Sequence, residues 1–171
     1  MKELFDSISQ EMSELTTKRY STSFSMGISL LHKDLHKPIY SIYGFVRFSD
    51  EIVDSFHDFD KKALLEDFKN QTHQAIQSKI SLNPILNSFQ WVVNTYNIPI
   101  DLIDTFLHSM EMDLEKQDYD KETYDKYILG SAEVVGLMCL CVFVEGNTKE
   151  YEALKPSAMK LGSAFQKINF L

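Results

Sequence analysis

The sequence predicts a single all-α domain, a bundle of about eight helices. Apolar residues recur at helical spacing along most of the chain, whereas the alternation typical of half-buried strands is scarce. Only six glycines and four prolines interrupt the 171 residues. A chain of this length, with 44% apolar and 25% charged residues, can enclose one hydrophobic core. No repeat, low-complexity linker or second domain divides residues 1–171.

The predicted helices are separated by short breaks that carry capping or turn residues. Asp58 or Asp60 is expected to cap the fourth helix, because a side-chain oxygen there accepts from a free backbone N–H. Pro38 is expected in the first turn of the third helix, where proline is tolerated. Pro84 and Pro99 each open a later helix. We predict helices at about 4–20, 24–31, 34–56, 60–78, 84–96, 99–116, 121–144 and 148–171.

The charge and the N-terminus restrict the classes of protein to which the chain can belong. A net charge of −8 argues against a nucleic-acid partner, since phosphate backbones need clustered Lys and Arg. The N-terminal stretch MKELFDSISQEMSEL is amphipathic and acidic and lacks the apolar centre of a signal peptide. The longest apolar run, 134–144, is shorter than the roughly 20 residues that span a bilayer. We therefore expect a cytoplasmic protein that contacts a membrane, if at all, only at its surface.

The two cysteines, Cys139 and Cys141, lie inside that apolar run. Residues two apart on a helix point about 200° apart around the axis, so the two thiols cannot share one ligand. The same geometry disfavours a disulfide between them. We expect two buried thiols in a reducing compartment.

One stretch, FVRFSDEIVD at residues 45–54, places acids and an arginine on an otherwise apolar helix. Four polar side chains recur at i, i+4, i+7 and i+11 and so share one helical face: Tyr43, Arg47, Asp50 and Asp54. Glu51 lies four residues after Arg47 and can form an ion pair with it. This acidic stripe is either a solvated face with incidental ion pairs or a divalent-metal site. Mg²⁺ takes one or two carboxylates together with phosphate oxygens and water.

Four stretches of the sequence resemble the squalene/phytoene synthases, and they occur in the order and at the spacing of that family. The first is Ser23-Phe24 followed by IYSIYGFVRFSDEIVD, which matches a Ser-Phe pair and then Tyr-(three)-Arg-(two)-Asp-(three)-Asp on one helix. The others are SMEMDLEKQDY at 109–119, YILGSAEVVGLM at 127–138 and SAFQKINFL at 163–171. The resemblance extends from about residue 20 to residue 171, and it favours the metal site over the solvated face.

This resemblance implies the isoprenoid synthase fold and the head-to-head condensation of two prenyl diphosphates through a cyclopropyl diphosphate. Mg²⁺ or Mn²⁺, held by aspartates on two facing helices, would bind the diphosphates. The motifs are most similar to those of bacterial phytoene synthases, which implies two geranylgeranyl diphosphates as substrates and phytoene as product, in carotenoid biosynthesis. No glycine-rich nucleotide-binding loop is present, so a need for NADPH is not expected. The alternatives are a squalene-type synthase that uses NADPH and a non-catalytic helical scaffold with the family fold.

By the same resemblance, individual positions take expected roles. Asp50 and Asp54 match the first metal-binding motif, and Glu51 stands where the family often has a further aspartate. Arg47, near Tyr43 on this helix, would meet the diphosphate. Asp113 is expected to be a structural or cavity-rim acid rather than a primary ligand. The remaining substrate-binding candidates are Ser23, Phe24, Tyr127, Gln166 and Asn169.

Two departures from the family pattern carry expectations of their own. Glu133 stands where the family often has glycine, and it is either a solvated residue or a new group near the cavity. In the family, the helix matched by residues 163–171 continues into Arg-Asp-(three)-Asp, the second metal-binding motif. We therefore expect a piece of a longer synthase that is inactive by itself. Its uncovered apolar surface is expected to drive formation of a homo-oligomer.

Overall fold

The computed structural model describes residues 1–115 and 126–169, with the side chains of the last helix described up to Ala164. Over these residues the chain is helical apart from short turns, and no strand is present. The predicted all-α class is confirmed. The predicted helix ends at Lys116 and Lys121 lie outside the described residues. The elements are α1 (Lys2–Tyr20), α2 (Thr22–Ser29), α3 (Lys33–Asp54), α4 (Lys61–Ser78), α5 (Pro84–Tyr96), α6 (Ile100–Leu114), the π-helix η1 (Leu129–Glu133), α8 (Val134–Phe143) and α9 (Thr148–Asn169).

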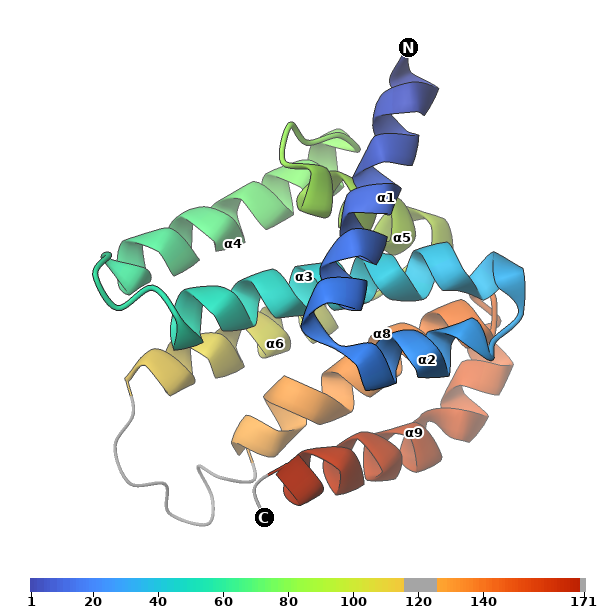
Figure 1. Ribbon diagram of the computed structural model, residues 1–171. Helices are drawn as coiled ribbons and strands as arrows, with labels where there is room; N and C mark the ends of the chain where they lie inside the picture. Colours follow the sequence, from blue (N-terminus) through green and yellow to red (C-terminus); the bar gives the residue numbers. More distant parts are fainter. Residues whose placement is uncertain (116–125, 170–171) are drawn as a thin grey trace.

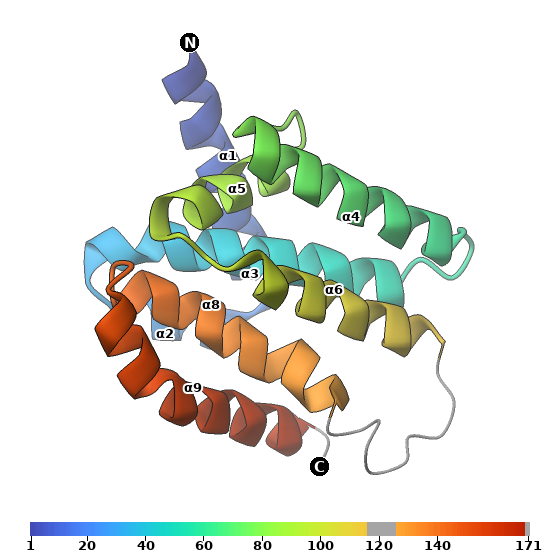
Figure 2. The ribbon, with the colours of Figure 1, turned by 180° about the vertical axis from the view of Figure 1, so that it is seen from behind.

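Helix α3 runs through the middle of the molecule (Figure 1). Helix α1 packs across α3 and α5, and α2 packs against α1 and α3. In the view from behind, α4, α5 and α6 lie in front of α3 (Figure 2). Helix α8 packs against α3 and α6, and α9 covers α8 and η1. Helix α3 is therefore held by neighbours on several sides.

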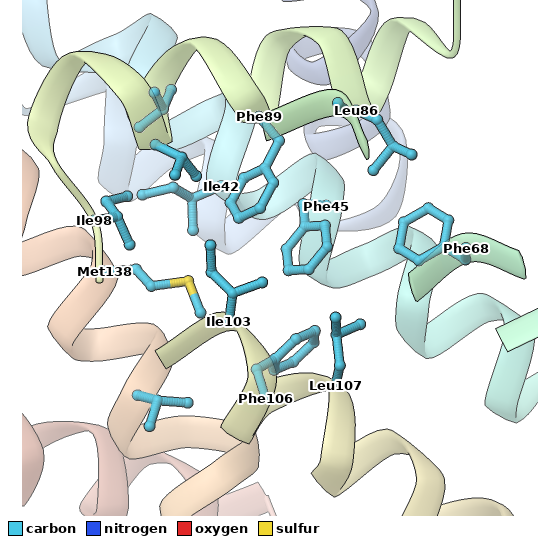
Figure 3. Close-up of a cluster of buried hydrophobic side chains, with 14 of the residues drawn as sticks. Ile42, Phe45, Phe68, Leu86, Phe89, Ile98, Ile103, Phe106, Leu107 and Met138 are labelled. Atoms are coloured by element: carbon cyan, nitrogen blue, oxygen red, sulfur yellow. The ribbon is translucent and has the colours of Figure 1, made fainter. Parts of the chain in front are cut away.

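The core is built around four phenylalanines from four helices (Figure 3). The Phe45 ring of α3 stacks on the Phe89 ring of α5 with 3.9 Å between their centroids. Its centroid lies 5.7 Å from that of Phe68 in α4 and 5.4 Å from that of Phe106 in α6. All four side chains are buried. One aromatic cluster thus fixes α3 against the three helices on that side.

The caps of two helices agree with the sequence. Asp60, rather than Asp58, caps α4, and its carboxylate accepts from the Ala63 N–H at 3.1 Å. Pro84 is the first residue of α5, where Asn83 serves as the cap. Proline fits there because its missing N–H would have no partner inside the helix.

The predicted position of Pro38 is wrong by one turn. Helix α3 begins at Lys33, so Pro38 lies in its second turn. The hydrogen bond that proline cannot make would have gone to the carbonyl of Asp34. Asp34 is exposed, so water can satisfy that carbonyl and the helix continues.

The predicted single helix over 121–144 is interrupted by η1. A Cβ on Gly130 would lie 2.6 Å from the Cβ of Ser109 in α6. A Cβ on Gly162 of α9 would lie 2.7 Å from the carbonyl oxygen of Ala132. Two helices thus approach the backbone of this segment too closely for side chains, and here the α-helical repeat widens into a π-turn. The end of the helix near Val144 is confirmed.

The segment Lys126–Phe143 is long and apolar enough, by length and composition alone, to cross a membrane. The expectation that no segment is long enough to span a bilayer is therefore wrong, because it considered only the uninterrupted apolar run 134–144. Half of the segment is buried within the bundle. It packs against α3, α6 and α9, as the core helix of a bundle does.

Both cysteines are unpaired. The expectation of two buried thiols is confirmed for Cys141 and wrong for Cys139, which is partly exposed. Desolvation of the sulfur and the nearby Cys141 raise the pKa of Cys139 to about 12, and desolvation raises the pKa of Cys141 to about 11. Neither sulfur therefore forms a reactive thiolate at neutral pH.

Candidate functional site

The acidic stripe lies on the face of α3 opposite the aromatic core. Tyr43, Arg47 and Asp50 are each half-buried, and Asp54 at the end of the helix is exposed. The residues between them, such as Phe45, turn inward and pack. The sequence therefore places a phenol, a guanidinium and two carboxylates in successive turns of one rigid helix.

Asp50 has the most perturbed carboxyl of the stripe. Burial raises its pKa to about 7, against the opposing effect of the Arg47 charge. Neighbouring acids raise the pKa further: Asp54, Asp113 and Glu51. At neutral pH this carboxyl is only partly ionised, and a divalent cation would compete with the proton for it.

Asp50 and Asp54 are hard oxygen donors one turn apart, which is the donor set that Mg²⁺ prefers. Among the residues that the structure describes, no group of three or more His, Cys, Asp or Glu side chains is arranged to hold a metal by itself. Mg²⁺ with two protein carboxylates takes its remaining ligands from phosphate oxygens and water. The pair therefore fits an ion that arrives together with an anionic substrate.

Arg47 is held from two sides. Its Nη2 lies 2.5 Å from Oε2 of Glu51, which confirms the ion-pair alternative for that acid. Its Cζ lies 4.5 Å from the centroid of the Tyr20 ring. Its Nε is buried without a hydrogen-bond partner. A buried donor that lacks an acceptor costs about 1–3 kcal/mol, and an anion could accept from this enclosed Nε only after the side chain shifts.

Tyr43 contacts the start of α2. The centroids of the Phe24 and Tyr43 rings are 5.1 Å apart. Burial raises the pKa of Tyr43, while the Ser21 hydroxyl lowers it. Ser23 is exposed in the first turn of α2, with its Oγ 3.5 Å from that of Ser21. The structure thus brings Phe24 against Tyr43 of the acidic stripe, whereas Ser23 lies beside Ser21 and its role at the site stays a prediction.

The remaining candidates differ in their outcome. Tyr127 is 9% exposed, so its ring lies inside the bundle, and its role at the site stays a prediction. Gln166 and Asn169 lie on the last turns of α9, but their side chains fall outside the described residues. Glu133 is half-buried and lines an open pocket of about 480 Å³ between η1 and α9, and both alternatives for its role stay open. The other residues that line this pocket are Pro156, Met159, Lys160, Ser163 and Ala164.

Two contacts at the site were missed by the sequence reasoning. Tyr20 reaches Arg47 from α1. Asp113, expected only at a rim, lies close enough in α6 for its charge to raise the pKa of Asp50. Neither contact follows from helical spacing, because each joins residues far apart in the chain.

Comparison with known proteins identifies the family of the chain. The family model described as squalene/phytoene synthase matches residues 17–171. Phytoene synthase 1, chloroplastic, from Solanum lycopersicum is 22% identical over 157 residues, which are 89% of this chain and 38% of that protein.

Two solved structures share the fold. A dehydrosqualene synthase in complex with a ligand superposes with a TM-score of 0.83 at 24% identity, over 96% of this chain and 56% of that one. Squalene synthase HpnC from Alicyclobacillus acidocaldarius superposes with a TM-score of 0.81 at 24% identity, over 94% of this chain and 59% of that one. The 171 residues thus span a little over half the length of these structures and less of the plant enzyme. The bundle has the isoprenoid synthase fold, and the chain belongs to the squalene/phytoene synthase family.

Proposed function

We propose that the acidic stripe of α3 binds the diphosphate of a prenyl diphosphate together with Mg²⁺, for head-to-head condensation of two such molecules. The observation that supports this proposal is that one face of α3 carries both a carboxyl with a raised pKa and an arginine with an unpaired donor. Asp50 there has a pKa of about 7, and the Nε of Arg47 is buried and unpaired. A metal and an anion would together satisfy both groups.

In this proposal each side chain of the acidic stripe has its own role. Asp50 and Asp54 hold the cation, and Mn²⁺ is an alternative to Mg²⁺ because both accept oxygen donors. Arg47 donates to a diphosphate oxygen, and Tyr43 borders the site with Phe24. A bound divalent ion supplies charge neutralisation to the departing diphosphate. Apolar side chains that exclude water would protect the reacting prenyl chain.

The finer assignment follows from the motifs. We propose geranylgeranyl diphosphate as substrate and phytoene as product, with no need for NADPH. We also propose that the 171 residues bind this substrate without condensing it, since only one aspartate pair of the family pattern is among them. The second candidate function is a non-catalytic helical scaffold with the family fold. A squalene-type reaction would instead require NADPH.

Calorimetry with geranylgeranyl diphosphate, in the presence of Mg²⁺ or of EDTA, tests the proposal. We expect binding that needs Mg²⁺, that Asp50→Asn weakens at least tenfold and that Asp101→Asn leaves unchanged. Asp101 is a matched control because it is an exposed acid in the first turn of α6. Binding that is absent, or independent of Mg²⁺, would favour the scaffold.

Product analysis tests the finer assignment. We expect no hydrocarbon from the 171 residues with Mg²⁺, with or without NADPH. Phytoene formed by these residues alone would overturn the proposed inactivity. Product that appears only with NADPH would identify the squalene-type reaction.

We further propose self-association through exposed apolar side chains, with surface contact to membranes and a cytoplasmic location. The outward face of α1 is a candidate surface, since it exposes four large apolar residues: Leu4, Ile8, Met12 and Leu15. Light scattering over a range of concentrations is expected to show an average mass above 19.8 kDa. A monomer at all concentrations would refute self-association. Sedimentation with neutral lipid vesicles tests the membrane contact.

A further inference from the structure

Tyr20 stands at a junction that fixes its position. It is the last residue of α1, and Ser21 both ends α1 and caps α2. The Ser21 N–H donates to the Thr17 carbonyl at 2.9 Å, and the Ser21 hydroxyl accepts from the Phe24 N–H at 3.2 Å. The backbone on which the Tyr20 ring is mounted is thus hydrogen-bonded into two helices.

The Tyr20 ring lies over the guanidinium of Arg47, at 4.5 Å from Cζ to the ring centroid. A guanidinium that stacks on an aromatic face keeps its edges free for hydrogen bonds. Glu51 occupies one of those edges through Nη2. The Ser55 hydroxyl, Arg47 and the Tyr20 side chain together lower the pKa of Glu51, against the effect of burial. Arg47 thus lies between the Tyr20 ring and the Glu51 carboxylate.

Tyr20 does not serve as a core residue. Its side chain is 50% exposed, so its truncation leaves no internal cavity. The ring instead limits the positions open to a long side chain that carries about 2 kcal/mol of rotamer entropy. Without the ring, Arg47 is free to swing into solvent or to pair with Asp50, which would remove a metal ligand.

We infer that Tyr20 is a positioning residue that holds the Arg47 guanidinium against Glu51, so that its remaining N–H groups are available to the bound diphosphate. The contact between Tyr20 and Arg47 rests on geometry alone. Its effect on diphosphate binding rests on the proposed function. The role acts through Arg47, since the ring itself has no group that binds metal.

Calorimetry with inorganic pyrophosphate and Mg²⁺ measures the consequence. We expect Tyr20→Leu to weaken binding about fivefold and Tyr20→Phe, which keeps the ring, to weaken it less than twofold. Tyr151→Leu is the control for loss of a cation–ring contact elsewhere, because Tyr151 contacts Lys155 at 5.9 Å on α9. Its ring also packs against the core, so circular dichroism must first show that this variant is folded. Binding by that control is expected to be unchanged.

A double-mutant cycle separates positioning from a general structural effect. In an Arg47→Met background, Tyr20→Leu is expected to have no further effect on pyrophosphate binding. An equal fivefold loss in both backgrounds would overturn the inference, since Tyr20 would then act without Arg47.

The Arg47 Nε–H signal in a proton–nitrogen correlation spectrum tests the contact independently of any ligand. The signal, assigned by its loss in Arg47→Lys, is expected to shift in Tyr20→Leu and to stay in place in Tyr151→Leu. A signal that stays in place in both variants would overturn the inference. If the signal shifts but the unmodified chain binds no pyrophosphate, the contact between Tyr20 and Arg47 is supported. The proposed function, and with it the role of Tyr20 in diphosphate binding, would then be refuted.

Discussion

Helices α1 and α3 pack against each other but bury different kinds of side chain. Helix α3 buries mostly apolar residues, of which Phe45 is fully enclosed, together with Ser41 and Ser49. Helix α1 exposes Leu4 and Leu15, at 62% and 55%, on its outward face. The three residues that α1 buries are all small and polar: Ser9, Ser13 and Thr17.

Hydrogen bonds explain how a polar face can be the packed one. The hydroxyls of Ser13 and Ser88 share a hydrogen bond of 2.6 Å. The Asn87 amide donates to Asp6 at 3.0 Å and to Ser9 at 3.1 Å. Buried polar groups with partners cost little, and small side chains let helices approach closely. The buried face of a helix thus depends on the surfaces of its neighbours as well as on its own most apolar stripe.

The largest expected effect comes from the apolar face of α3, at the aromatic core. We expect Phe45→Ala to lower the free energy of unfolding by about 3–5 kcal/mol, because it removes three ring contacts and leaves a cavity. Phe48→Ala on the same helix, where the ring is 37% exposed, should cost less than about 1 kcal/mol. Urea denaturation followed by circular dichroism measures both. Similar losses would mean that α3 is not anchored through this cluster.

A pair of substitutions in α1 should invert the usual hydrophobic rule. Ser13→Leu is expected to destabilise by about 1–3 kcal/mol, because a larger side chain would be forced into a fully packed seam. A Cβ on Gly44 would already lie 2.9 Å from the Ser13 hydroxyl. Leu15→Ser should change stability by no more than about 0.5 kcal/mol. Thermal unfolding that ranks the two variants in the opposite order would show that α1 buries its apolar face.

The acidic stripe gives a smaller, pH-dependent effect. Because the folded pKa of Asp50 is raised to about 7 from its ordinary value of 3.8 in the unfolded chain, the native state binds more protons than the unfolded state between these values. Stability should therefore fall as pH rises through this window, by about 1–2 kcal/mol after allowance for partial exposure. Asp50→Asn should remove that slope, so the variant gains stability over the unmodified chain at pH 8. Asp101→Asn is the control, and denaturation at several pH values is the measurement. An unchanged slope in Asp50→Asn would mean that this carboxyl is not perturbed.

Much of the fold was predictable because its signals are local. Asp60 and Pro84 mark helix starts through hydrogen bonds within their own turn. The acidic stripe was predictable for the same reason, since one helix carries all its members. Phe24 also lies beside this stripe, with its ring against Tyr43.

The features that the sequence did not predict depend on tertiary contacts. The π-turn at η1 lies where Gly130 and Gly162 admit two neighbouring helices, and neither glycine reveals its neighbour in the sequence. The inward face of α1 depends on Asn87 and Ser88 of α5. The Tyr20 contact with Arg47 depends in turn on how α1 docks.

The polar attachment of α1 also bears on local unfolding. Less apolar surface opposes the detachment of α1 than that of α3, so α1 should open at a lower free energy than the whole domain. Tyr20 travels with α1, and each opening would therefore withdraw the ring from Arg47. The fraction of molecules in which the Tyr20 ring holds Arg47 is then set by the fraction in which α1 is packed against the bundle. Amide protons of α1 should exchange with solvent before those of α3, and a bound anion should slow that exchange at a distance.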